Sequence, residues 1–206
     1  VILQAEEGGR EGGPPFEWDI MIDIGDTSGS QTPPDDEEGE EVVRQYAAST
    51  AHPRADFYNI VGNHDASGPD EPCQWWFRKW VDPTGEHTAH SGVDAAKRPY
   101  PVDGTWERYK FEVGNIVFLM MGDRNDGGPP VGRGTKGGYP AGAVTMETFE
   151  WWCEEVLANR DRIIVTAHHH MLKGTTVAST DWLGVNEGYH GRFDDGAPAG
   201  ASYLYW

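Results

Sequence analysis

Cysteine, basic residues and long apolar runs are all scarce in this chain of 206 residues. Cys73 and Cys153 are its only cysteines, and two cysteines so far apart do not define a disulfide. We expect both to be buried thiols rather than metal ligands, with Cys73 inside a helix. No apolar run approaches the roughly 18 residues that a membrane-spanning helix needs, so we expect no membrane span.

Positive charge is short relative to negative charge, with 16 basic and 34 acidic residues and a formal net charge of -18. Binding to a nucleic-acid polymer needs clustered lysine and arginine, so this balance argues against such a partner. The acidic run at residues 35–38 lacks the spacing of a calcium loop and is typical of a solvated helix start, where acids complement the helix dipole. The length suits one domain with a substantial core.

Apolar runs alternate with polar and glycine-rich breaks in a way that predicts an α/β protein. We expect strands at residues 18–24, 56–60, 107–113, 116–121 and 162–167, with the third and fourth joined as a hairpin. Helices are expected over residues 35–49 and 71–81, and from the capping residue Thr145 onward. The composition of residues 125–142, and of the chain from residue 173 on, predicts loops. Residues 203–206 predict one more strand.

Three of the expected strands are followed by side chains that can bind a metal or carry a proton. The carboxyl ends of strands are where open α/β sheets form their sites, so we expect these side chains to converge. Gly62 would let the backbone turn where a Cβ atom would clash. The three segments are Gly25-Asp26 after the first strand, Gly62-Asn63-His64-Asp65 after the second, and His168-His169-His170 after the last.

This succession of Gly-Asp, Gly-Asn-His-Asp and a histidine cluster resembles the calcineurin-like metallophosphoesterases over residues 18–206. The resemblance implies a metallophosphoesterase-type β-sandwich of mixed sheets flanked by helices, forming a single domain over residues 1–206. It also implies hydrolysis of a small phosphate mono- or diester through a hydroxide that bridges two divalent metal ions. Mixed nitrogen and oxygen ligands suit Mn, Fe or Zn, and the sequence does not choose among them.

The resemblance further implies a role for each site residue. Asp26 matches the carboxylate that bridges the two ions, and Asn63 matches a ligand of the second ion. His169 is the expected imidazole ligand, with His168 as the alternative. His64 matches a group that stabilises the transition state or protonates the leaving oxygen. Asp65 would either bond His64 and hold its tautomer or cap a turn.

Two motifs of the family are missing from this chain. No histidine occurs before His52, so there is no Asp-x-His ahead of Gly25. His190 does not form a final Gly-His-x-His, because no second histidine follows it at the required spacing. We therefore expect the chain to be a segment truncated at both ends, which alone would bind one ion weakly and lack activity.

Other polar residues rank lower as ligands. His87 and His90 lie in an expected loop with no strand leading into it. Asp123 belongs to a second Gly-Asp pair, but the family's ligand aspartate precedes the Gly-Asn-His motif. Arg124 would contact a substrate phosphate or, by preference, form a surface salt bridge.

Two other functions are compatible with these residues. One is a mononuclear zinc hydrolase built on the histidine cluster, although the chain lacks a His-Glu-x-x-His helix. The other is a non-catalytic binding domain with a degenerate metal site, which would use its aromatic-rich loops to hold a partner.

Overall fold

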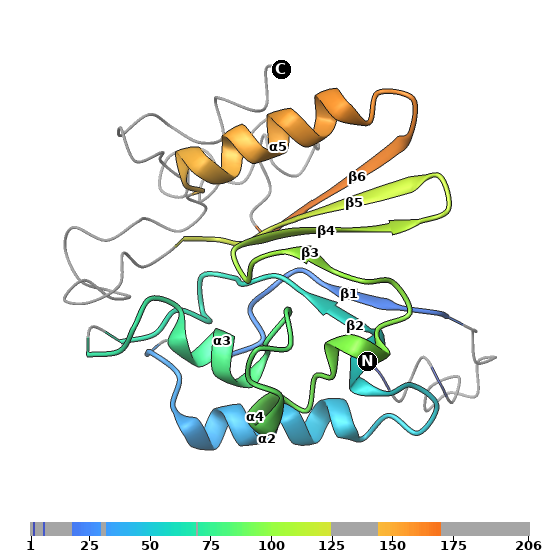
Figure 1. Ribbon diagram of the computed structural model, residues 1–206. Helices are drawn as coiled ribbons and strands as arrows, with labels where there is room; N and C mark the ends of the chain where they lie inside the picture. The colour runs from blue at the N-terminus through green and yellow to red at the C-terminus, as the bar shows by residue number, and fades with distance from the viewer. Residues whose placement is uncertain are drawn as a thin grey trace, which may run out of the picture.

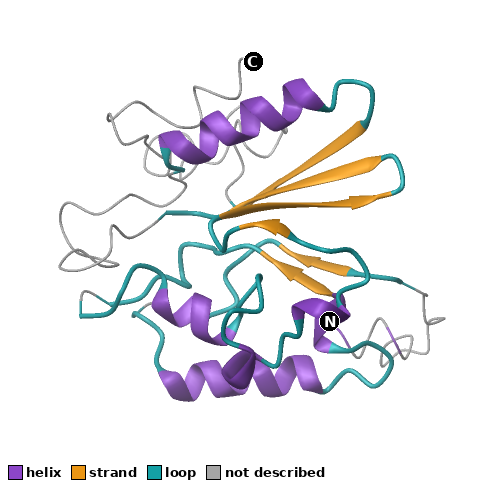
Figure 2. Ribbon diagram, in the orientation of Figure 1, coloured by secondary structure: helices purple, strands orange, loops and turns teal. Residues whose placement is uncertain are grey.

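Two β-sheets lie face to face between layers of helices in the computed structural model, which describes residues 2, 6, 18–29, 32–68, 70–124 and 144–169 (Figures 1 and 2). The first sheet consists of β1 (Met21–Asp23) and β2 (Phe57–Asn59). The second has the order β3 (Asp103–Gly104), β4 (Arg108–Val113), β5 (Ile116–Met121) and β6 (Ile163–His168). The α/β class predicted from the sequence is therefore confirmed.

Helices cover the outer face of each sheet (Figure 1). On the side of the first sheet lie α2 (Asp36–Ala47), α3 (Trp75–Trp80) and α4 (Thr88–Ser91), while α5 (Met146–Ala158) covers the second sheet. Two short 3₁₀ helices, Arg54–Asp56 and Ala95–Lys97, lie in the connections. Among the described helices, none is long and apolar enough to cross a bilayer.

The two sheets differ in strand direction. β1 and β2 are parallel, whereas the second sheet has antiparallel pairs up to β5 and a parallel β5–β6 pair. We predicted mixed sheets, and only the second sheet is mixed. The β4–β5 hairpin is confirmed, with Val113 opposite Ile116 across the Gly114-Asn115 turn.

Two hydrophobic clusters hold the layers together. Phe57 of β2 packs with Val42 and Tyr46 of α2 and with Trp76 and Trp80 of α3 in the outer cluster. Tyr58 points to the other face of β2, because successive side chains of a strand alternate, and it packs between the sheets with Tyr109 and Phe111. The short β2 strand is fully buried on both faces for this reason.

Helix ends follow the expected capping chemistry in two cases. The carboxylate of Asp35 accepts the backbone N–H of Glu38 at 3.0 Å, and the hydroxyl of Thr145 accepts that of Thr148 at 3.1 Å. The helix predicted over residues 71–81 is shorter, because Gln74 adopts a left-handed backbone (φ 53°) and α3 begins only after it.

Several smaller predictions are wrong. Cys73 lies in the turn before α3 rather than in a helix, and both cysteines are half-buried rather than buried. His90 lies in α4, not in a loop, and its ring meets that of Trp80 edge-on. The predictions for His170, His190 and residues 125–142, 173–202 and 203–206 fall outside the described residues.

Candidate metal centre

The first element of the site is a close contact between two turns, one after β1 and one after β2. Gly25 and Asp26 both have positive φ, at 97° and 59°. A Cβ atom on Gly25 would lie 2.5 Å from the amide nitrogen of Gly62, and one on Gly62 would lie 2.2 Å from the amide nitrogen of Asp26. Both glycines are therefore required by the close approach of the two backbones.

Asp65 joins these two turns. One carboxylate oxygen accepts the backbone N–H groups of Gly62 at 2.7 Å and of Asp26 at 3.0 Å, and the other accepts that of Ser28 at 2.8 Å. The side chain is fully buried. Asp65 therefore caps the turns, which is one of the two roles expected for it. The other role, a bond from Asp65 to the His64 ring, stays a prediction.

Three side chains from separate parts of the chain meet where the turns face β6. The Nε2 atom of His169 lies 3.1 Å from Oδ1 of Asn63 and 3.2 Å from Oδ2 of Asp26. The other carboxylate oxygen of Asp26 accepts the backbone N–H of His64 at 2.8 Å. The expected convergence at strand ends is therefore present, but it joins the two sheets, because β1 and β2 belong to one and β6 to the other.

The hydrogen bonding of His169 determines which of its nitrogens faces the other two side chains. Its Nδ1 lies 2.7 Å from the carbonyl oxygen of Ile24, which can only accept, so Nδ1 carries a proton. In the neutral imidazole, the lone pair of Nε2 then points at two further acceptor oxygens. Either a second proton or a cation must lie between these atoms.

The two distances from Nε2 of His169 are compatible with a divalent cation. Ligand atoms about 2.1 Å from an ion and at right angles to each other lie about 3.0 Å apart. The distances of 3.1 and 3.2 Å from Nε2 match that value. One imidazole, one carboxylate and one amide oxygen form a mixed donor set suited to Mn, Fe or Zn.

The same contacts shift the pKa values of the two ionisable members. Burial alone would raise the pKa of Asp26, but hydrogen bonds from His169 and from the amide of His64 lower it overall. Burial alone would lower the pKa of His169, but the hydrogen bond and the charge of Asp26 raise it to about 9. Burial raises the pKa of Asp65 to about 7, against the opposing effect of the N–H groups of Ser28 and Gly62.

The structure discriminates between the two candidate histidines. His169 contacts both Asp26 and Asn63, whereas His168 is the last residue of β6 and pairs opposite Met121. Adjacent residues of a strand point to opposite faces, which directs His168 away from that contact. Within the described part of the chain, no group of three or more His, Cys, Asp or Glu side chains is placed to hold a metal ion.

A polar network beneath the site was not predicted. Oδ2 of Asp23 accepts the hydroxyl of Tyr46 at 2.7 Å and the amide of Asn59 at 3.0 Å, and Arg54 donates to the carbonyl of that amide at 3.0 Å. Burial, followed by the charge of Asp23, raises the pKa of Tyr46.

The second Gly-Asp pair also lies near the site. Asp123 is fully buried, its backbone N–H donates to the carbonyl of Val61 at 3.0 Å, and its charge contributes to the raised pKa of His169. Arg124 forms the predicted salt bridge, to Glu107 at 3.1 Å. That salt bridge is largely buried rather than on the surface, which corrects the prediction.

Comparison with known proteins adds no relative. No family model matches the chain, and neither the curated protein sequences nor the solved structures contain a match.

Proposed function

We propose that this protein is a metal-dependent phosphoesterase that hydrolyses phosphate mono- or diesters of small molecules. The observation that carries the proposal is the contact of His169 Nε2 with Asn63 Oδ1 at 3.1 Å and with Asp26 Oδ2 at 3.2 Å. The three residues come from the motifs that resemble the calcineurin-like metallophosphoesterases. The two facing sheets with outer helices are compatible with the sandwich fold that the resemblance implies.

Asp26, Asn63 and His169 would hold one divalent ion, and a second ion would need further ligands. When bound, such ions supply Lewis acidity toward a phosphoryl oxygen and lower the pKa of the attacking water. The chain itself contributes the positioning of the donors. Asp65 fixes the two turns, and the Ile24 carbonyl orients the His169 ring so that Nε2 faces Asp26 and Asn63.

His64 would supply the proton chemistry. Its backbone N–H bonds the carboxylate of Asp26 at 2.8 Å, which holds the residue next to the donors. Its side chain is only partly buried and therefore accessible to a substrate. An imidazole beside a reacting phosphate can stabilise the developing charge or protonate the leaving oxygen.

The main alternative is a binding domain with a degenerate metal site. It is favoured by one observation, that the described residues include no three-member group of His, Cys, Asp or Glu placed to hold a metal ion. A mononuclear zinc hydrolase would need three strong protein ligands, and at this contact His169 supplies one imidazole beside Asp26 and Asn63.

Metal titration and turnover separate these possibilities. We expect the chain to bind Mn²⁺, and Asp26→Asn and His169→Asn to weaken that binding by about a hundredfold, because the first removes the anionic charge of its donor and the second removes the imidazole. Turnover is measured on p-nitrophenyl phosphate and on its bis ester, with and without Mn²⁺, using the product of the complete gene. His64→Asn should lower turnover by about a hundredfold without changing Mn²⁺ affinity.

The matched control is His168→Asn, which changes the neighbouring imidazole and should leave Mn²⁺ affinity unchanged. Mn²⁺ binding with no turnover of either ester would favour the binding domain. Absence of Mn²⁺ binding that depends on Asp26 and His169 would overturn the metal site itself.

A further inference from the structure

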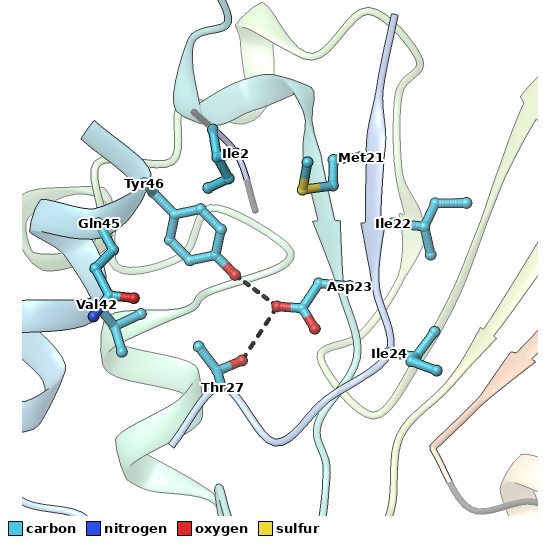
Figure 3. A pocket seen from close by; sticks show the side chains of 9 residues that line it. All are labelled: Ile2, Met21, Ile22, Asp23, Ile24, Thr27, Val42, Gln45 and Tyr46. Atoms are coloured by element: carbon cyan, nitrogen blue, oxygen red, sulfur yellow. Dashed lines mark hydrogen bonds between the residues drawn. The ribbon is translucent and has the colours of Figure 1, made fainter. Parts of the chain in front are cut away.

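A cavity of about 400 Å³ lies between α2 and β1, beside the strand that leads to Asp26 (Figure 3). Residues of α2, of β1 and of the turn after β1 form its walls, together with Ile2. It is large enough for a small organic ligand. The cavity is separate from the contact of Asp26, Asn63 and His169, since none of these three residues lines it.

The charged group of the cavity is the carboxylate of Asp23 (Figure 3). Its Oδ2 accepts hydrogen bonds from Tyr46 at 2.7 Å, Asn59 at 3.0 Å and Thr27 at 3.5 Å. Its Oδ1 accepts one, from the backbone N–H of Gly25 at 3.1 Å. Since a carboxylate oxygen has two lone pairs, Oδ1 keeps room for another donor.

All four donors to Asp23 are neutral. Among the described residues, no Lys, Arg or His lies in salt-bridge contact with this carboxylate, and Arg54, whose charge attracts Asp23 at longer range, donates to Asn59 instead. A partly buried carboxylate to which no cation is bonded is stabilised by a ligand cation at Oδ1.

The remaining walls are largely apolar. Ile2, Met21 and Val42 contribute aliphatic side chains, and Val42 is buried. Gln45 lines the cavity as well and is exposed, and its amide nitrogen donates to Glu41 at 3.2 Å. The protein's net charge of -18 attracts cations and repels anions.

We propose that this cavity is a binding site for a small organic cation, a primary ammonium group on an apolar stem. The ammonium would donate to Asp23 Oδ1, and the stem would lie against Met21 and Val42. Charge and hydrogen bonding favour this ligand over a neutral or anionic molecule of the same shape, and the apolar walls suit its stem. The proposal does not depend on phosphoesterase activity or on a bound metal.

Calorimetric titration of the chain with 2-phenylethylammonium chloride, compared with 2-phenylethanol at equal ionic strength, tests the charge requirement. The two molecules differ only in the ammonium and hydroxyl groups. We expect saturable binding of the ammonium ion, at least about tenfold tighter than the alcohol, because charge-assisted hydrogen bonds are the stronger class. Equal affinities, or no binding of the ammonium ion, would overturn the proposal.

Two tryptophan substitutions on α2 locate the binding. Gln45→Trp places a large ring at a residue that lines the cavity, whereas Ala47→Trp places it at another exposed residue of the helix that does not. Both keep the net charge. We expect Gln45→Trp to weaken ammonium binding by about tenfold and Ala47→Trp to leave it within about twofold. The same effect in both variants would assign the binding to the general acidic surface and overturn the proposal.

Asp23→Asn removes the charge while keeping the shape of the side chain. In protein that stays folded, by circular dichroism, the ammonium ion should lose its advantage over the alcohol. A folded Asp23→Asn protein that still prefers the ammonium ion would refute the role of Asp23. If this variant does not fold, the Gln45→Trp and Ala47→Trp pair decides.

Discussion

Two polar clusters, only a few residues apart on β1 and the turn that follows it, are built in opposite ways. In the buried network, donors and acceptors alternate: Arg54 donates to Asn59, and Asn59 and Tyr46 donate to Asp23. At the strand ends, by contrast, the oxygens of Asp26 and Asn63 both face a single imidazole nitrogen.

The difference separates structural polar groups from groups suited to binding. In the network, Oδ2 of Asp23 and the side chain of Asn59 are bonded by the chain's own donors, which stabilises the fold without any ligand and leaves Oδ1 of Asp23 as the group open to an outside donor. The cluster at the strand ends is satisfied only when His169 carries a second proton or when a cation takes the place of that proton. Changes in the network should therefore affect stability, and changes at the strand ends should affect binding.

Arg54→Ala should produce the largest loss of stability. The guanidinium donates to the Asn59 side chain and to the Val81 carbonyl at 2.7 Å and lies over the Tyr46 ring at 4.0 Å. Removing it leaves buried acceptors without a donor, and we expect the free energy of unfolding in urea to fall by about 3 kcal/mol. Arg44→Ala, in an exposed pair with Glu41, is the control and should change little. Equal effects would contradict the comparison.

Gly62→Ala should affect both stability and binding. The new Cβ atom would lie 2.2 Å from the amide nitrogen of Asp26 and 2.5 Å from its Oδ1, so the two turns must separate. We expect a loss of about 2 kcal/mol in unfolding free energy and a large drop in Mn²⁺ affinity. Gly29→Ala is the matched control, because nothing lies within 4 Å of its Cβ position. Retained Mn²⁺ affinity in Gly62→Ala would show that the turn contact is unnecessary.

His169→Asn should change stability less than either of these variants. The loss of its bonds to Ile24 and Asp26 removes about 1 kcal/mol, because the pair lies at the edge of the protein. Thermal unfolding without metal measures this loss of stability. A destabilisation as large as that of Arg54→Ala would remove the distinction between the two clusters.

The pH dependence of stability gives the most specific effect. The pKa of His169 is raised to about 9 in the folded protein from an ordinary value of 6.5, so the imidazolium is favoured by folding. Its contribution is complete below about pH 6.5 and is lost as the pH rises through about 9. Urea unfolding without metal should show this loss in the wild-type protein, and the His169→Asn variant should be flatter in that window. Parallel profiles would be inconsistent with the assigned ion pair.

Local patterns predicted most elements but not their assembly. The β4–β5 hairpin and the Thr145 cap depend on neighbours in sequence, so composition and spacing suffice to place them. The pairing of β5 with β6 joins residues 116–121 to 163–168, and no local pattern indicates that partner or the division into two sheets.

For the candidate site, too, the sequence predicted the residues but not how the turns around them pack. The positions of Asp26, Asn63 and His169 after strands were sufficient to anticipate their convergence. The sequence alone does not show why both Gly25 and Gly62 are needed, because the contact between their two turns forms only in the folded protein. The choice between His168 and His169 requires the register of β6 against β5, because one step along a strand reverses the face.

The bond from His169 to the Ile24 carbonyl links the residue that follows β6 of the second sheet to the end of β1 in the first. An ion shared by Asp26, Asn63 and His169 would cross-link the two sheets. Chelation would remove that cross-link. The amide protons of β6 would then exchange with solvent faster than those of β4, because β4 is flanked by a strand on each side.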